Sequence, residues 1–168
     1  TQAPITAGKS FHSYQGRTLR TARNYWVITE ESAADRQDEI IISDFPVKVI
    51  FGNYEIAFKT AEAPVLEMKT PADYSSILAD VSKLKYPIRL RRFIPGDRIS
   101  TPGMQGRHKK LKKIFNEAGT DLKIRAELPV LESDGSILWV PGHAMSEMIS
   151  NHGDSSGIMI WTCRRIQA

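Results

Sequence analysis

The sequence is short of cysteine and of long apolar runs, and each shortage excludes a class of protein. Cys163 is the single cysteine in 168 residues, which excludes an internal disulfide and favours a reducing compartment. No apolar run approaches the roughly 18 residues that a membrane span needs. The first ten residues lack the charged and apolar regions of a signal peptide. We therefore expect a cytoplasmic protein that does not enter a membrane.

The chain also lacks an initiator methionine, because it begins with Thr1. We therefore expect it to start inside a longer protein. Its 41% apolar and 25% charged residues are typical of a globular protein and exclude a disordered one.

Charge is distributed very unevenly along the chain. Residues 24–80 hold four basic and eleven acidic groups, a net charge of −7. Residues 83–113 hold eleven basic groups against Asp97 alone, a net charge of +10. Such a dense positive block is typical of a surface that binds a polyanion, and it favours nucleic acid over a merely solvated face.

Several patterns resemble catalytic motifs but lack the context that the chemistry needs. Residues 3–10 end in Gly-Lys-Ser, yet no strand precedes them and no helix-forming sequence follows. Residues 153–157 fit G-x-S-x-G around Ser155, but neither an acid nor a histidine follows. The histidines and the cysteine have no metal-ligand spacing. Asp97 follows Pro-Gly and is interpreted as a turn residue. We expect no catalytic, cofactor-binding or metal-binding residue on this chain.

The first half is predicted to be rich in strands. Residues 25–29 and 39–43 are short β-branched and aromatic runs. Gly52 and Asn53 separate two further runs and indicate a hairpin. Residues 74–84 suit either a short helix or a strand.

The second half is predicted to contain one clear helix. Residues 88–93 alternate as a strand with arginines on one face, and a Gly- and Pro-rich loop follows. The helix is predicted over 108–118, with a buried stripe at i, i+3, i+4, i+7 and Gly119 as its C-terminal stop. Its opposite face carries Lys109, Lys112, Lys113 and Asn116.

Residues 122–126 and 128–132 are predicted as extended runs, and Asp134-Gly135 marks the tip of a hairpin. A final alternating strand ends the chain. The fold class is therefore α+β, with mostly antiparallel, β-sandwich-like sheets and one basic amphipathic helix in two lobes. We place the acidic, β-rich lobe at 1–82 and the basic lobe at 83–168.

Residues 86–142 carry several motifs in an order that resembles the C-terminal domain of tRNA(Ile)-lysidine synthetase. The motifs are P-G-D-R, P-x-G-M, a K-K-L-K-K-x-F helix, an Arg followed by a Pro-Val-Leu strand, and I-x-W-V-x-G. Upstream, residues 8–28 are similar to the family's G-x-x-F-x-S segment and the strand after it. The resemblance implies a β-sandwich with helices against it, and it favours a strand at 74–81.

This resemblance implies a tRNA-modifying ligase that uses ATP and Mg²⁺ to join lysine to the wobble cytidine of CAU-anticodon tRNA(Ile). The family's ATP-pyrophosphatase motif, S-G-G-x-D-S, does not occur in this chain. The resemblance therefore implies a tRNA-binding part without a cofactor of its own, whose partners are that tRNA and an N-terminal catalytic domain.

The basic groups after residue 88 are the candidate RNA contacts, because arginine forks and lysine point charges suit the phosphates of an A-form stem. By alternation Arg92 shares a side with apolar residues, so a structural role stays open for it. Arg125 is expected to pair with an acid such as Glu127 or Glu132. The candidates are Arg89, Arg91, Arg92, Arg98, Lys109, Lys110, Lys112, Lys113 and Arg125.

Two other readings stay open at the level of sequence. One is a freestanding RNA-binding module that never joined a ligase. The other is a protein-interaction domain whose basic lobe docks on an acidic partner, such as the acidic lobe of a second copy in a homodimer.

Overall fold

The computed structural model describes residues 10–12, 17–21, 26–30, 39–45, 48–61, 73–150 and 157–166. The chain forms two compact units, residues 1–36 and residues 37–168. The first unit contains an antiparallel sheet of β1 (Ser10–His12), β2 (Arg17–Thr21) and β3 (Trp26–Glu30). Residue 82, where the sequence suggests the end of the acidic lobe, lies within the second unit.

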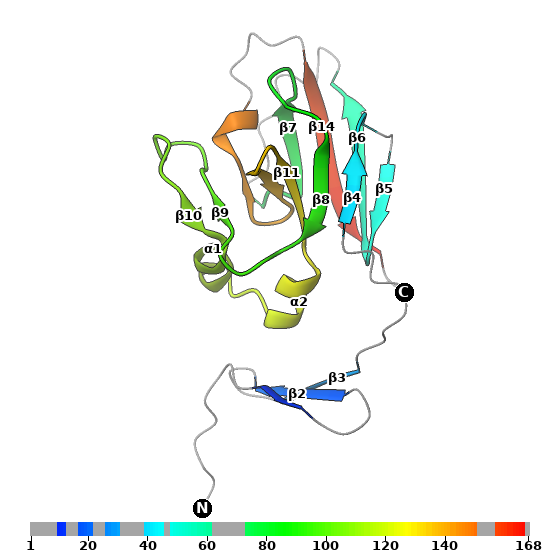
Figure 1. Cartoon of the computed structure of the whole chain (residues 1–168), viewed down its shortest axis with the longest axis vertical. Coiled ribbons are helices and arrows are strands. Elements are labelled where there is room, and N and C mark those ends of the chain that lie inside the picture. The colour runs from blue at the N-terminus through cyan, green and yellow to red at the C-terminus, as the bar shows by residue number, and fades with distance from the viewer. Residues whose placement is uncertain are drawn as a thin grey trace, which may run out of the picture. The chain divides into compact units, whose positions relative to one another are not determined.

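The second unit is built on two antiparallel sheets (Figure 1). The four-stranded sheet has the order β5 (Lys48–Phe51), β6 (Tyr54–Thr60), β14 (Ile158–Arg165), β7 (Ser76–Asp80). The five-stranded sheet has the order β13 (Ala144–Met145), β12 (Ser136–Val140), β11 (Pro129–Ser133), β8 (Ile88–Arg92), β4 (Glu39–Ile42). Strands from both sides of residue 82 therefore share each sheet.

The main core lies between these two sheets. Leu90, Leu131 and Trp139 are opposite one another on the inner face of the five-stranded sheet. Phe58 and Trp161 pair on the four-stranded sheet and belong to the same buried cluster. The rings of Trp139 and Trp161 lie 6.0 Å apart, so the sheets are held by large apolar side chains whose burial stabilises the sandwich.

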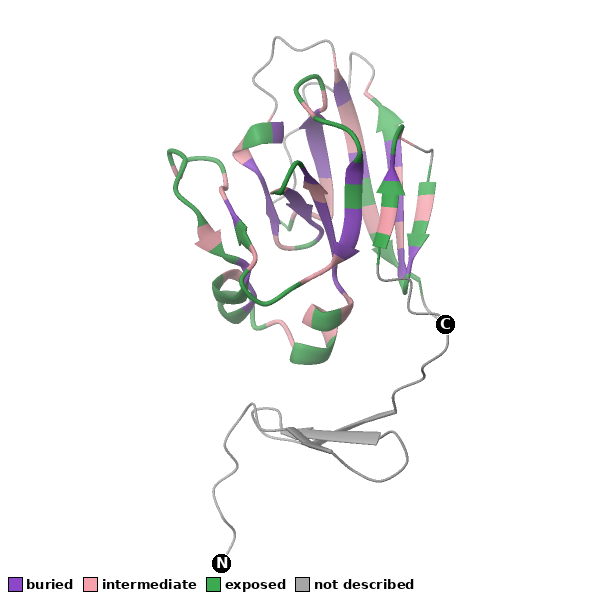
Figure 2. Ribbon diagram, in the orientation of Figure 1, coloured by how far each residue is buried: buried purple, intermediate pink, exposed green. Residues whose placement is uncertain are grey.

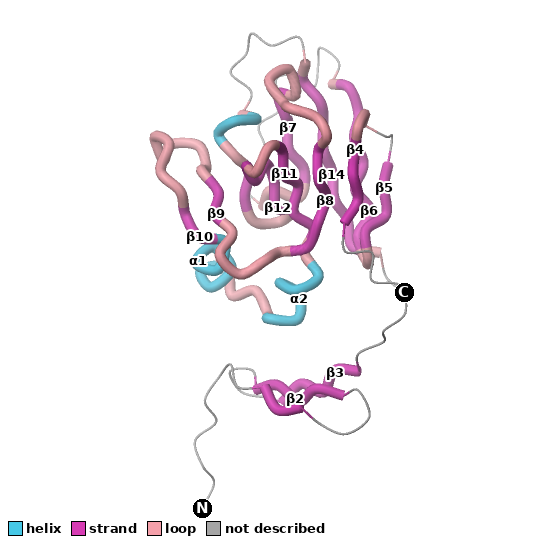
Figure 3. The backbone as a smooth tube through the Cα atoms, viewed as in Figure 1, coloured by secondary structure: helices cyan, strands magenta, loops and turns pink. Residues whose placement is uncertain are grey.

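A third layer covers part of the outer face of the five-stranded sheet. It contains a ribbon of β9 (Arg98–Ile99) and β10 (Lys109–Lys110) and helices α1 (Leu111–Glu117) and α2 (Leu122–Glu127) (Figure 3). The 3₁₀ turn Glu147–Ile149 follows β13, and its Ile149 is buried in the main core. Leu111 and Phe115 are fully buried in a second apolar cluster. Figure 2 shows the exposed sides of both helices turned away from the buried strands. The chain thus places its basic segment on a well-packed support.

The α+β class with mostly antiparallel sheets is confirmed, and the described residues contain two short α-helices in place of the one predicted. Helix α1 begins at Leu111 and not at the predicted 108, because Lys109 and Lys110 pair with Ile99 and Arg98 as a strand. The predicted stop is confirmed: Gly119 has a φ of +66°, a conformation that glycine adopts without strain.

The extended run predicted at 122–126 is wrong, since these residues form α2. Asp121 caps this helix: its Oδ1 accepts a hydrogen bond from the backbone N–H of Lys123 at 2.8 Å. Both predicted hairpins are confirmed, one turning at Gly52-Asn53 and one at Asp134-Gly135. The strand favoured at 74–81 is present as β7. No helix among the described residues is long and apolar enough to cross a membrane.

Candidate nucleic-acid interface

The ribbon and α1 present a group of exposed cations that we name the basic face: Arg98, Lys110, Lys112 and Lys113. Arg98 and Lys110 are direct partners across the ribbon, and α1 begins at the residue after Lys110. In the described part of the chain, none of the four makes an ion pair. Their charge is therefore available to an external anion.

Lys109 is engaged within the domain and differs in this from the basic face. Its side chain is half-buried and forms an ion pair with Glu117 on α1. This hydrogen bond lowers the pKa of Glu117 below its ordinary value. Lys109 therefore contributes mainly to joining the ribbon to α1.

Arg91 lies in a buried network with two carboxylates. The residue is only 8% exposed, and its guanidinium makes a two-pronged contact with Asp97 at 2.9 and 3.0 Å. Its Nε also donates to Glu132 Oε2 at 2.8 Å. Although burial lowers the pKa of Arg91, these hydrogen bonds raise it above its ordinary value. Its donors are thus used inside the protein, and a direct RNA contact by Arg91 stays a prediction.

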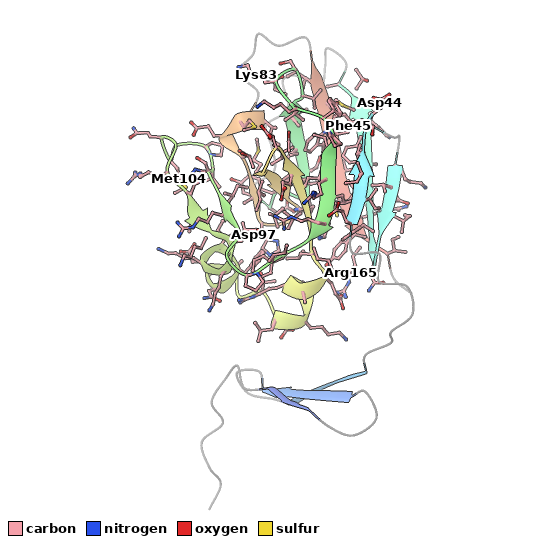
Figure 4. The ribbon with its side chains drawn as sticks, viewed as in Figure 1. Asp44, Phe45, Lys83, Asp97, Met104 and Arg165 are labelled. Carbon is pink, nitrogen blue, oxygen red and sulfur yellow. The ribbon has the colours of Figure 1, made fainter. Side chains whose placement is uncertain are left out.

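The same network connects the five-stranded sheet to the basic face. Asp97 Oδ2 accepts from the backbone N–H of Ile94 at 2.9 Å, which fixes the turn before β9. The backbone oxygen of Asp97 accepts from the N–H of Leu111, the first residue of α1, also at 2.9 Å. Asp97, labelled in Figure 4, therefore connects β8, the ribbon and α1 through its hydrogen bonds. Its interpretation as a turn residue is confirmed.

The remaining candidate arginines have varied surroundings. Arg89 is exposed and lies 3.4 Å from Glu39 on the neighbouring strand. Arg92 is half-buried over the ring of Phe51, at 5.5 Å from its centroid. Such a cation–π contact helps to hold an arginine against the fold. The structural role that strand alternation suggested for Arg92 is therefore compatible with the structure.

Arg125 does not pair with either acid expected from the sequence. Its Nε donates to the backbone oxygen of Thr120 and its Nη1 to Asn116 Oδ1, both at 2.8 Å. Glu127 instead faces Arg165, and Glu132 is held by Arg91. The expected pairing is therefore wrong, and Arg125 joins the two helices through neutral acceptors.

His143 packs behind α1 and is held as a neutral imidazole. Its Nδ1 is 2.9 Å from the carbonyl oxygen of Pro141, so Nδ1 carries the proton, and its Nε2 is 2.8 Å from Thr120 Oγ1. Its ring meets Phe115 edge to face at 5.0 Å. Burial, assisted by the charge of Arg125, lowers the pKa of His143 below its ordinary value.

This lowered pKa predicts a loss of stability on mild acidification. Between the folded pKa and the ordinary value near 6.5, the unfolded chain binds a proton that the folded chain does not, so the free energy of unfolding falls as pH falls. We expect urea melts between pH 7 and pH 5 to show a shallower pH dependence for His143→Gln than for the unmodified chain. His108→Gln, at an exposed position, is the matched control; an equal flattening by both variants would contradict the assignment.

Some members of the site were not singled out from the sequence. Arg107 is exposed in the ribbon loop, and its Nε donates to the backbone oxygen of Met104 at 3.3 Å. Arg107 lies within the basic block at residues 83–113, and this charge pattern could have indicated it. Of the rejected catalytic patterns, Ser155 lies outside the described residues. Among the described residues, no three His, Cys, Asp or Glu side chains are grouped so that they could hold a metal ion.

The fold and the site define an antiparallel, β-rich α+β domain whose ribbon and helix present cations that make no ion pair with any residue the structure describes. Within it, residues 88–161 match the model of the family described as TilS substrate C-terminal domain. This segment is therefore similar to the TilS substrate C-terminal domain, and the resemblance found in the sequence is confirmed.

Solved and curated relatives agree with this assignment. A structure described as "Crystal structure of TILS C-terminal domain" superposes with a TM-score of 0.65 and 26% identity, over 77% of this chain and 99% of that one. The tRNA(Ile)-lysidine synthase of Bacillus thuringiensis subsp. konkukian is 40% identical over 74 residues, which are 42% of this chain and 15% of the relative. The synthase of Bacillus cereus is 43% identical over 65 residues, 38% of this chain and 13% of that relative. The chain thus matches a small part of these enzymes.

Proposed function

We propose that this chain binds tRNA and serves as the substrate-holding part of a tRNA(Ile)-lysidine synthetase. The observation that carries the proposal is the basic face, whose four cations are exposed and without ion pairs in the part of the chain that the structure describes. These residues lie within the segment that matches the TilS substrate C-terminal domain.

The geometry suits the backbone of an RNA stem better than its base edges. The deep, narrow major groove of A-form RNA does not admit side chains, so a stem is recognised through phosphates, 2′-hydroxyls and shape. Lysines on one short helix, beside an arginine on a ribbon, supply mobile point charges and one planar fork for phosphate oxygens. The Arg91 network keeps these elements in fixed relation, which reduces the ordering cost of binding.

In this proposal the chain contributes binding and the chemistry takes place elsewhere. The ligase would use ATP and Mg²⁺ to activate the wobble cytidine of CAU-anticodon tRNA(Ile) and would then join lysine to it. Because this chain has no S-G-G-x-D-S motif, that reaction is assigned to a separate N-terminal domain. The chain's own part is to hold the tRNA body so that the anticodon reaches that domain.

The test is a titration of the chain into CAU-anticodon tRNA(Ile) and into a DNA duplex of the same length, each over a salt series. We expect tighter binding to the tRNA, with log K falling against log salt by about 0.9 per phosphate neutralised, or roughly 3–4 in total for the basic face. Equal affinity for both would contradict tRNA recognition and indicate a non-specific polycation. An absence of binding to either would overturn the proposal in favour of a protein partner.

A further inference from the structure

A groove of about 650 Å³ lies directly beside the basic face. Its lining comes from the ribbon and the turn before it, from the tip of the β11–β12 hairpin, and from the segment around the 3₁₀ turn. Residues far apart in sequence thus meet here. The lining includes Arg98, Ser100, His108, Ile137, Glu147 and Met148.

The groove combines an apolar surface with hydrogen-bonding groups. Ile137 is buried in its lining, and the side chain of Met148 is unusually exposed for a large apolar residue, at 46%. Ser100 Oγ is buried and has no hydrogen-bond partner in the described part of the chain. A buried hydroxyl without a partner is unfavourable, so a ligand that supplies a partner gains affinity.

The charged side chains that line the groove are of both signs. Arg98 and His108 are exposed on the ribbon side, where the groove meets the basic face. Glu147 also lines the groove beside Ser100, because its backbone N–H donates to the oxygen of Ser100 at 2.8 Å. Asp97 also lines the groove, but Arg91 neutralises it. A simple anion would meet Glu147 as well as the cations, so the lining does not suit a bare phosphate.

We propose that this groove receives an unpaired nucleotide of the bound RNA, an inference that rests on the proposed function. A nucleobase has apolar faces and a polar edge, which match Ile137 and Met148 on one hand and Ser100 and Glu147 on the other. A carboxylate accepts from an exocyclic amino group, which favours cytosine or adenine over uracil. The nucleotide's phosphate would lie towards Arg98 and His108. Paired bases cannot enter, so the nucleotide is single-stranded.

The experiment compares two RNAs that share one hairpin stem. One is blunt, and the other carries an unpaired cytidine or adenosine stretch of three nucleotides beyond the stem. We expect the unmodified chain to bind the second RNA about tenfold more tightly, the gain that one stacked base provides. A 2-aminopurine placed in the unpaired stretch should change its fluorescence on binding. Equal affinity for the two RNAs would overturn the proposal.

Ser100→Ala separates the groove from the basic face. We expect this variant to lose about fivefold affinity for the RNA with the unpaired stretch, the value of one hydrogen bond, and to keep its affinity and salt dependence on the blunt stem. Because Ser100 Oγ has no partner to lose, its melting temperature should not fall. Met148→Ala should show the same selectivity, and Ser43→Ala, at an exposed site away from the groove, should change neither affinity.

The outcomes distinguish this proposal from the proposed function. Salt-dependent binding to the blunt stem without any gain from the unpaired stretch rejects the groove and keeps the stem-binding role. A gain that Ser100→Ala and Met148→Ala leave intact also rejects the groove. Failure to bind either RNA rejects the proposed function itself.

Discussion

Replacing Arg91 by methionine is expected to lower the free energy of unfolding by about 3–5 kcal/mol, the usual cost of removing one partner from a buried ion pair. The substitution leaves the carboxylates of Asp97 and Glu132 without their cation, and both side chains are close to 90% buried. It also frees the turn that Asp97 fixes and thereby loosens the ribbon and α1. Urea-induced unfolding, followed by tryptophan fluorescence, measures the effect.

Arg89→Met is the matched control, because Arg89 occupies the same strand and also faces a carboxylate. That pair is exposed, with 48% and 41% of the two side chains accessible, so its loss should cost less than about 1 kcal/mol. If the two variants were equally stable, the Arg91 network would not support the fold. Arg91→Lys tests the fork itself, since a lysine keeps the charge but cannot make the two-pronged contact.

Replacing Lys110, Lys112 and Lys113 together by alanine is expected to reduce the slope of log K against log salt for an RNA stem by about 2–3. In the proposed binding mode each exposed lysine neutralises one phosphate, so the variant would release correspondingly fewer counterions. Lys109 is left unchanged because its ion pair with Glu117 already uses its charge. Fluorescence anisotropy with a labelled stem, at five salt concentrations, gives the slope.

A second triple variant, Lys48→Ala/Lys59→Ala/Arg164→Ala, changes the net charge equally on β5, β6 and β14. These strands belong to the four-stranded sheet, outside the layer that carries the basic face. We expect its salt slope to stay close to that of the unmodified chain. An equal reduction by both triple variants would show that overall charge, and not the basic face, determines binding.

Local features were predictable wherever local chemistry decides the backbone. The Gly-Asn and Asp-Gly pairs fix tight turns through positive φ, as at Gly52, Asp134 and Gly135. The stop at Gly119 has the same cause. The family motifs in residues 86–142 were specific enough to indicate the domain. These motifs follow one another along the chain, although the structure places them in different layers of the domain.

Features decided by tertiary contacts were not predictable from the pattern. Lys109 and Lys110 fit the helical pattern of the sequence, but they pair with β9 as a strand. Helix α1 therefore begins after them and not at the predicted residue 108. Strand alternation places Arg91 on the arginine-bearing face, yet the layer over that face buries it. The groove could not be predicted from the sequence, because its lining comes from separate segments between residues 91 and 148. Several of its residues are serines and glycines, which form no recognisable motif.

The position of β14 has a consequence for the order in which the domain can fold. This last strand lies between β6 and β7, and it pairs with residues of β6 roughly 100 positions earlier in the chain. The strand β4 likewise pairs with β8, which comes later in the chain. Each sheet therefore combines strands from early and late parts of the sequence. Such high contact order makes folding slow, typically milliseconds to seconds, and delays closure of the core until the C-terminal strand is available. The matched segment 88–161 holds neither of the strands that flank β14, and the strands of both sheets together run from Glu39 to Arg165.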